Sequence, residues 1–224
     1  MMDFPGTTLG ACQPARTQLV VCLGNPGDKY AGTRHNAGFL VADQLQAVSA
    51  FDAATPWQPA CGELRSLDLY GFDCLLLRPL AYMNSSGEVV KEVTARFGFS
   101  PAELIVVSDC LDLPLGRLRI RAGGSSAGQK GVASIAQHLE TGAFPRFRIG
   151  IGRPQSTDIA IIDYVLAPWT SAEQAVVRQV VAVAANLVVT ALKQGLNAAM
   201  NLGNSWSADN INASEKGEPN VEKV

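Results

Sequence analysis

Apolar and polar positions follow two periods along the chain, and each period predicts one kind of secondary structure. Residues 18–23 form a short, β-branched run that Gly24 ends, which predicts a buried strand, and from Asn36 apolar residues recur at helical spacing to about residue 49. The same patterns predict further strands at 63–69, 72–77, 104–107, 117–121 and 147–151, with a turn at Gly71. They predict further helices at about 84–97, at 130–139 and from Ser171 onward.

The starts of two of these elements carry capping signals. Ser100, Pro101 and Glu103 form a capping box with proline in the first turn, so a brief helical turn precedes the strand at 104. Gln174 stands in the capping-box position relative to Ser171, where the long last helix is expected to open. This helix has apolar residues at helical spacing, so it must be buried against a sheet or another helix: Val176, Val180, Ala184, Leu187 and Ala191.

Because strands and helices interleave, the predicted fold is α/β: a single three-layer domain with a twisted mixed β-sheet flanked by helices. A chain of 224 residues with 47% hydrophobic residues has enough apolar material for one sizeable core. This domain is expected at residues 17–203. Residues 1–16 lack periodicity and residues 204–224 are polar and charged, so both are expected to be disordered extensions.

Composition and charge indicate how the protein can bind phosphates and in which compartment it is expected. The formal net charge is −2 and the pI is near 5.7, so phosphate binding must come from a local basic patch and not from the whole surface. The five cysteines form no Cys-x-x-Cys motif and three lie in apolar runs, which indicates buried free thiols in a reducing, cytoplasmic compartment. No signal peptide opens the chain and the longest apolar helix carries charges, so we expect no membrane segment.

His35 is the strongest candidate for chemistry, since it follows a buried strand and precedes a helix, where α/β folds expose reactive groups. Asp109 follows the apolar strand at 104–107, so the carboxylate is expected to meet His35 at the same edge of the sheet. A carboxylate that accepts from one ring nitrogen lets the other nitrogen take a proton from water as a general base. The competing interpretation is a structural histidine with satisfied hydrogen bonds.

Asn25 and Asn84 each stand beside a turn or a helix start. Either side chain can simply cap the local backbone. Alternatively, the two carboxamides hold the backbone of a peptide-like substrate or the developing oxyanion, because they offer donors and an acceptor without charge.

Basic residues alternate with apolar ones at 117–121, so Arg117, Arg119 and Arg121 share one face of a strand. A charged strand edge that resists aggregation is one interpretation. The other is a phosphate-binding surface of limited extent, suited to an RNA end, to which neighbouring segments contribute Lys130, Arg146, Arg148 and Arg153.

Residues 124–128 match Gly-x-Ser-x-Gly and raise the alternative of a serine hydrolase. The only downstream histidine is His138, in the very next predicted helix, and no acid lies between Ser126 and His138 to complete a triad. We therefore interpret the glycines as a flexible loop beside a cleft. Two distant histidines and scattered cysteines also offer no metal-ligand spacing.

Five motifs together resemble the bacterial-type peptidyl-tRNA hydrolase family: Leu-Gly-Asn-Pro-Gly at 23–27, Tyr-x-x-Thr-Arg-His-Asn-x-Gly-Phe at 30–39, Met-Asn-x-Ser-Gly at 83–87, Asp-x-Leu-Asp-Leu-Pro-x-Gly at 109–116 and Arg-Ile-Gly-Ile-Gly-Arg-Pro at 148–154. The resemblance spans roughly residues 18–202. It implies a monomeric, cytoplasmic translation enzyme that cleaves the ester between a peptide and the terminal ribose of tRNA without metal or cofactor.

The resemblance also implies site residues. The implied catalytic residues are His35 as base, Asp109 as its partner, and Asn25 and Asn84. The implied substrate contacts are Asn25, Tyr30, Tyr82, Met83, Asn84, Gln129 and Lys130. The implied contacts to tRNA phosphates are Arg119, Arg121, Arg148 and Arg153.

The chain departs from the family pattern at two places. Gln129 and Lys130 replace a usual His-Asn pair that is assigned to substrate contact, and residues 155–158 lack the lysines that many relatives place after Gly-Arg-Pro. These departures leave an alternative of another class open, namely an RNA-binding protein of the same fold with weak or no catalytic activity.

Overall fold

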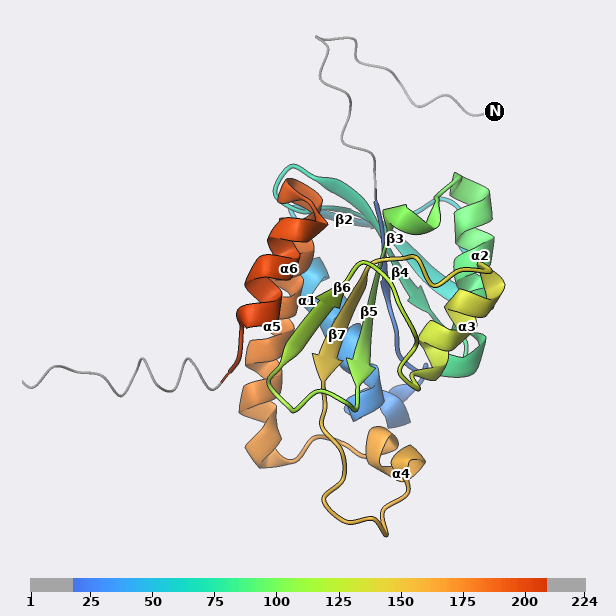
Figure 1. Cartoon of the computed structure of the whole chain (residues 1–224). Helices are drawn as coiled ribbons and strands as arrows, with labels where there is room; N and C mark the ends of the chain where they lie inside the picture. The colour runs from blue at the N-terminus through green and yellow to red at the C-terminus, as the bar shows by residue number, and fades with distance from the viewer. Residues whose placement is uncertain (1–17, 209–224) are drawn as a thin grey trace, which may run out of the picture.

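The computed structural model describes residues 18–208 and contains a seven-stranded sheet in the order β2-β3-β4-β1-β5-β7-β6 (Figure 1). β1 pairs in parallel with β4 and β5, and β5 pairs in parallel with β7, whereas β2, β3 and β6 join antiparallel. The predicted mixed sheet is therefore confirmed. The strands are β1 (Gln18–Cys22), β2 (Phe51–Ala54), β3 (Gly62–Asp68), β4 (Asp73–Pro79), β5 (Leu104–Cys110), β6 (Leu118–Arg121) and β7 (Arg146–Gly150).

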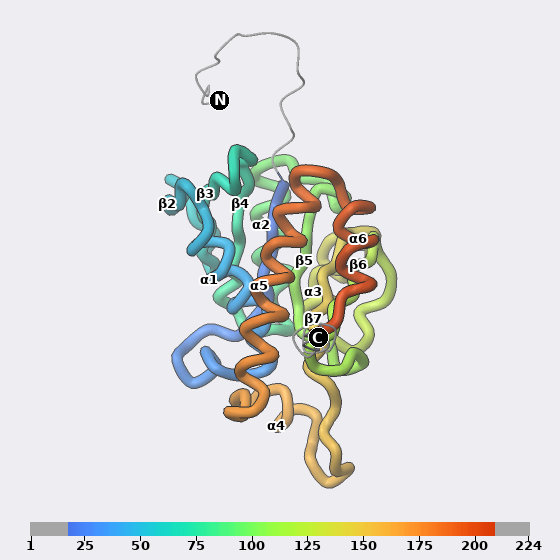
Figure 2. The backbone as a smooth tube through the Cα atoms, turned by 90° about the vertical axis from the view of Figure 1, so that its left-hand side faces the viewer, coloured from blue at the N-terminus to red at the C-terminus, as the bar shows by residue number. Residues whose placement is uncertain are grey.

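Helices cover both faces of this sheet, which makes the three predicted layers. One face carries α1 (Ala37–Val48), α5 (Ser171–Gln194) and α6 (Leu196–Ser205), and the other carries α2 (Ser86–Phe97) and α3 (Lys130–His138) (Figures 1 and 2). The short α4 (Ile161–Leu166) lies beyond the sheet, at the end to which β5 and β7 point (Figure 1).

The central strands are apolar on both faces because both faces are buried. In β1, Val20 and Cys22 belong to the core beneath α1 and α5, whereas Leu19 and Val21 belong to the core beneath α2 and α3. This explains why β1 is a continuous apolar run and not an alternating one. Cys22, Cys74 and Cys110 are buried free thiols, as expected, and burial raises the pKa of both Cys22 and Cys74 to about 12. The expectation was wrong for Cys61, which is an exposed free thiol, and Cys12 lies outside the described residues.

The sequence patterns missed three elements and misplaced one start. β2, α4 and α6 are too short or too exposed to carry a clear period, and Gly195, at φ +86°, separates α6 from α5. The capping box of α5 lies one residue earlier than predicted. Thr170 Oγ accepts from the Glu173 N–H at 3.3 Å and the Glu173 carboxylate accepts from the Thr170 N–H at 2.7 Å.

The expected C-terminal extension does not begin at residue 204, because α6 continues to Ser205. The Asn204 carboxamide accepts from the Ile120 N–H at 2.7 Å and donates to the Ile120 carbonyl at 3.2 Å, so α6 occupies part of the open edge of β6. Residues 1–17 and 209–224, which include most of both predicted extensions, lie outside the described residues.

α5 is long and apolar enough to cross a membrane by length and composition alone. Half of its most apolar window is buried inside the domain, where Val180, Ala184 and Val188 belong to the main core. α5 is therefore the central core helix on its face of the sheet.

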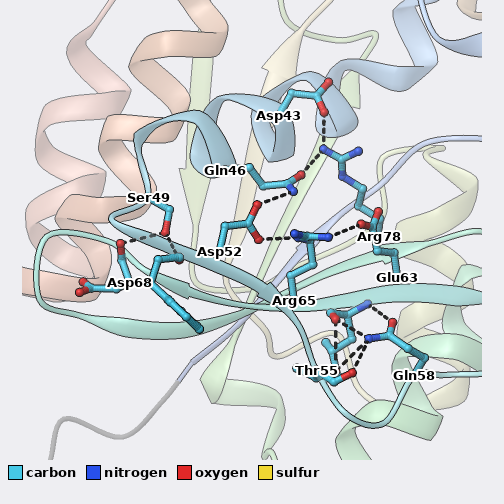
Figure 3. Close-up of polar contacts among 12 residues, drawn as sticks. Asp43, Gln46, Ser49, Asp52, Thr55, Gln58, Glu63, Arg65, Asp68 and Arg78 are labelled. Atoms are coloured by element: carbon cyan, nitrogen blue, oxygen red, sulfur yellow. Dashed lines mark hydrogen bonds and ion pairs between the residues drawn. The ribbon is translucent and has the colours of Figure 1, made fainter.

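A polar network lies where α1 meets β2, β3 and β4 (Figure 3). Arg65 pairs with Asp52 and Glu63, and Arg78 pairs with Asp43. Gln46 joins the two groups, since its carboxamide donates to Asp52 at 3.0 Å and accepts from Arg78 at 2.6 Å. Burial raises the pKa of Asp52, but hydrogen bonds from Arg65 and Gln46 outweigh it, and the net shift is downward.

Candidate active site

The candidate site lies at the carboxyl ends of β1 and β5, the two adjacent central strands. His35 belongs to a short 3-10 turn, Arg34–Asn36, that leads directly into α1. α1 can approach closely because Gly38 has no side chain: a Cβ there would lie 2.4 Å from the Leu23 carbonyl and 2.7 Å from the Val107 carbonyl. The backbone thus brings the start of α1 against both strands and places His35 beside the end of β5.

The imidazole of His35 contacts the carboxylate of Asp109, as predicted. His35 Nδ1 lies 2.9 Å from Asp109 Oδ2, and only 3% of Asp109 is exposed. Because the ionised carboxylate only accepts hydrogen bonds, Nδ1 carries the proton and Nε2 of the neutral ring keeps its lone pair. Nε2 has no hydrogen-bond partner within residues 18–208 and is left open to accept a proton.

Two cavities share His35 in their lining. The first cavity, of about 300 Å³, runs from β5 along the glycine-rich loop at 123–128 to α4. The second cavity, of about 310 Å³, is lined by Asn25, Tyr30, His35, Tyr82, Met83, Asn84, Lys130, Ile162 and Leu166. Lys130 and Ile162 line both cavities as well, so three residues stand at the boundary between them: His35, Lys130 and Ile162.

Asn25 presents a carboxamide of fixed orientation to the second cavity. Its Oδ1 accepts from the Met83 N–H at 2.9 Å, so the NH2 group must be the part that remains without a partner in the described chain. Asn36, which sequence reasoning missed, holds the backbone of Asn25 from both sides, at 2.9 Å to its N–H and 3.0 Å to its carbonyl. Of the two interpretations left open for Asn25, a local cap and a carboxamide facing a substrate, the structure shows no local cap: the side chain bridges two loops and lines the second cavity.

The other predicted substrate contacts gather around the same cavity. Asn84 and Tyr82 are exposed, Tyr30 is half-buried, and all three line the second cavity. Met83 is 3% exposed and forms the floor between the second cavity and Gln129. Lys130 is exposed and forms no ion pair or hydrogen bond with any described residue, so its ammonium group is free to meet a ligand.

Gln129, which the resemblance implies as a substrate contact, lines the first cavity but is largely buried. Its side chain is 8% exposed, donates to Asp109 Oδ1 at 3.0 Å and accepts from the Val132 N–H at 2.7 Å, which caps α3. Its polar atoms are therefore occupied inside the protein.

Arg34, which the sequence analysis did not single out, ties the His35 turn to α4 and α5. Its guanidinium donates to both Glu173 oxygens, at 2.7 and 3.0 Å, and to the carbonyls of Ala167 and Pro168, at 3.2 and 3.0 Å. The guanidinium carbon also lies 4.5 Å from the centre of the Tyr164 ring. Through these contacts Arg34 sets the distance between His35 and α4. Residues of α4 line both cavities.

Four arginines share one face of β6 and β7, because Arg119 pairs across the strands with Arg148 and Arg121 with Arg146. Arg121, Arg146 and Arg148 line a hollow with residues 123–125 beside the first cavity. Arg146 is buried, and its guanidinium donates to the carbonyls of Gly124 and Ser125. These hydrogen bonds stabilise the glycine-rich loop. Burial, reinforced by Arg148, lowers its pKa.

The remaining predicted phosphate contact, Arg153, already has a partner. Arg153 Nη2 lies 2.6 Å from Asp112 Oδ1, and the same carboxylate lies 3.9 Å from Arg148. Both Arg153 and Asp112 are exposed, so solvent screens this pair and an incoming phosphate can exchange for the carboxylate.

The structure gives no support to a serine hydrolase. Ser125 and Ser126 line the first cavity, but among the described residues neither hydrogen-bonds to a histidine. His138 Nδ1 instead contacts the Ser134 carbonyl at 2.9 Å, on the side of α3 that faces Gly87 of α2. Within residues 18–208 no group of three or more His, Cys, Asp or Glu side chains is arranged to hold a metal ion.

Comparisons with known proteins give one consistent result. The peptidyl-tRNA hydrolase family model matches residues 19–212. A peptidyl-tRNA hydrolase of Aquifex aeolicus is 43% identical over 176 residues, which cover 79% of this chain and 90% of the relative. A peptidyl-tRNA hydrolase of Synechococcus sp. is 45% identical over 186 residues, which cover 82% of this chain and 81% of the relative. The crystal structure of peptidyl-tRNA hydrolase from Acinetobacter baumannii superimposes with a TM-score of 0.79 at 32% identity, over 88% of this chain and 99% of that one. The chain therefore belongs to the peptidyl-tRNA hydrolase family.

Proposed function

We propose that the protein hydrolyses the ester between a peptide, or an N-blocked aminoacyl group, and the terminal ribose of tRNA, with His35 as the general base. The observation that carries this proposal is the contact of His35 Nδ1 with Asp109 at 2.9 Å in a residue that lines two cavities. An ester in such a site needs a deprotonated water and a polarised carbonyl, and both can be supplied by the side chains present.

In the proposed reaction, His35 Nε2 takes a proton from water as the water oxygen attacks the ester carbonyl carbon. The negative charge that develops on the carbonyl oxygen is stabilised by the Asn25 NH2 group and by the Lys130 ammonium, which both line the second cavity. The carbon–oxygen bond to the ribose then breaks, and the ribose oxygen receives the proton from His35. Asp109 stays ionised throughout and stabilises the imidazolium form.

The two cavities suggest how the substrate divides. The second cavity, with its asparagines and tyrosines, suits the peptide portion, because carboxamides pair with backbone amides and apolar rings accept varied side chains. The first cavity leads toward the arginine face, so it suits the terminal nucleotide, with Arg119, Arg121, Arg148 and Arg153 placed to meet phosphates. We further propose that the protein acts as a cytoplasmic monomer.

The test compares binding with turnover. Wild-type protein is mixed with tRNA carrying an N-acetylated, labelled amino acid, and both complex formation and release of the label are measured. The proposal predicts rapid release at neutral pH. Binding without release would support the RNA-binding alternative, which no feature of the site favours, since the imidazole, the carboxylate and both asparagines are in place.

A further inference from the structure

Asp109 is held by two donors and not only by His35. Its Oδ2 lies 2.9 Å from His35 Nδ1, and its Oδ1 accepts from Gln129 Nε2 at 3.0 Å. The carboxylate is 3% exposed, so these two side chains supply the hydrogen bonds that water would otherwise provide. The strength of each bond therefore affects the other through the same carboxylate.

The orientation of the Gln129 carboxamide follows from its neighbours. The Val132 N–H is a donor and lies 2.7 Å from one end of the amide, so that end must be the oxygen. The NH2 group then faces Asp109 Oδ1 and the Met83 sulfur, at 3.0 and 3.1 Å. A flipped amide would set a donor against the Val132 N–H and an oxygen against the carboxylate, which are both repulsive.

We propose that Gln129 is a positioning residue that sets the proton affinity of His35 through Asp109. Its neutral donor draws charge from the carboxylate and weakens the pull of Asp109 on the Nδ1 proton. The inference rests on the proposed role of His35, and it assigns Gln129 a place behind the base and not at the substrate.

Other charged or titratable groups also face His35, and the experiment leaves them unchanged. Arg34 adjoins His35 and pairs with Glu173. The groups that line the two cavities are Tyr30, Tyr82, Cys110, Lys130, Arg146 and Arg148. A difference between wild type and a Gln129 variant therefore arises from the contacts of Gln129 itself, with Asp109, Val132 and Met83.

The first variant is Gln129→Glu, which keeps an acceptor for the Val132 N–H and replaces only the donor. Because two adjacent carboxylates strengthen the attraction for the proton on His35, the low-pH limb of the kcat/KM profile should move upward by about one pH unit. The rate at pH 6 should then fall about tenfold and recover at higher pH, while KM stays within about twofold.

The second variant is Gln129→Ser, which removes the donor without adding charge and supplies a residue well suited to cap α3. The profile should move upward here too, by a smaller amount, while stability is largely kept. The signal of the His35 Nδ1 proton in NMR spectra, identified by its loss in Asp109→Ala, should shift in both Gln129 variants. This spectroscopic measurement needs no substrate, so it tests the inference even if ester hydrolysis itself is not observed.

Two results would overturn the inference. A KM that rises about tenfold with an unmoved pH profile would make Gln129 a substrate contact, as the family resemblance implied. A loss of stability with unmoved pH profiles and an unmoved NMR signal would make it only the cap of α3.

Discussion

Removal of the Arg34 guanidinium tests whether the contacts of this side chain hold the site together. Arg34 is 5% exposed, and its guanidinium donates to both oxygens of Glu173 as well as to three backbone carbonyls. Arg34→Met keeps most of the apolar stem and deletes every one of these bonds. The variant therefore separates the packing of the stem from the hydrogen bonding of the head group.

The expected cost follows from what the substitution leaves behind. Breaking a buried ion pair by removing one partner costs about 3–5 kcal/mol. Here the lower end applies, because Glu173 is 21% exposed and keeps its hydrogen bonds with Thr170, so water and the helix cap compensate part of the loss. We expect Arg34→Met to lower the free energy of unfolding by about 3 kcal/mol.

The same substitution should reduce activity, since Arg34 joins the turn of His35 to α4, whose Ile162 borders both cavities. Urea denaturation gives the stability, and kcat/KM on N-acetylated aminoacyl-tRNA gives the activity. Arg34→Lys is the matched control: it keeps the charge but not the planar fork, so it should recover less than half of the loss. A loss below about 1 kcal/mol in Arg34→Met, with unchanged kcat/KM, would refute the reasoning.

Three further predictions concern packing, pH and tRNA. Gly38→Ala should lower the free energy of unfolding, measured by urea denaturation, by about 1–3 kcal/mol and should lower kcat, because its Cβ would press on the Leu23 and Val107 carbonyls. Gly32→Ala is the control and should be neutral, since a Cβ there has nothing within 4 Å. Equal effects of the two substitutions would contradict this. Burial raises the pKa of Glu173, but hydrogen bonds from Thr170 and Arg34 outweigh it and hold the pKa below the ordinary 4.5. Its stabilising contribution is therefore complete above that pH and is lost as pH falls through the lowered value, so Glu173→Gln should flatten the acid side of the stability curve, and an unchanged curve would contradict the assignment. Arg148→Ala should weaken tRNA binding and reduce its salt dependence by about one phosphate contact while sparing a minimal ester; an unchanged salt slope would remove Arg148 from the interface.

The sequence was informative where one local pattern determines the structure. The apolar run of β1, the turn at Gly71 and the capping box of Ser100 and Glu103 all appear as predicted, because each depends on residues within a few positions. The contact between His35 and Asp109 was also predictable, since His35 follows β1 and Asp109 lies near the end of β5, and the carboxyl ends of these parallel neighbours lie at the same edge of the sheet.

Long-range partners were not predictable in the same way. Arg34 pairs with Glu173, which lies 139 residues further along the chain, and no spacing in the sequence indicates that pairing. In the sequence, Gln129 is simply a polar residue of the kind found at protein surfaces. Its hydrogen bond to Asp109 becomes evident only in the folded chain. The sequence suggested Arg146 as a contributor to the basic surface from a neighbouring segment, yet its buried guanidinium donates to the backbone of the glycine-rich loop.

In the proposed reaction the imidazole of His35 removes a proton from water. This role is tested by single-turnover cleavage of N-acetylated aminoacyl-tRNA by His35→Ala, with and without added imidazole. We expect that tRNA affinity is retained, that cleavage slows by about 10²–10⁴-fold, and that free imidazole restores part of the rate in proportion to its unprotonated fraction. Cleavage within about threefold of wild type, at saturating protein and without added imidazole, would contradict this role.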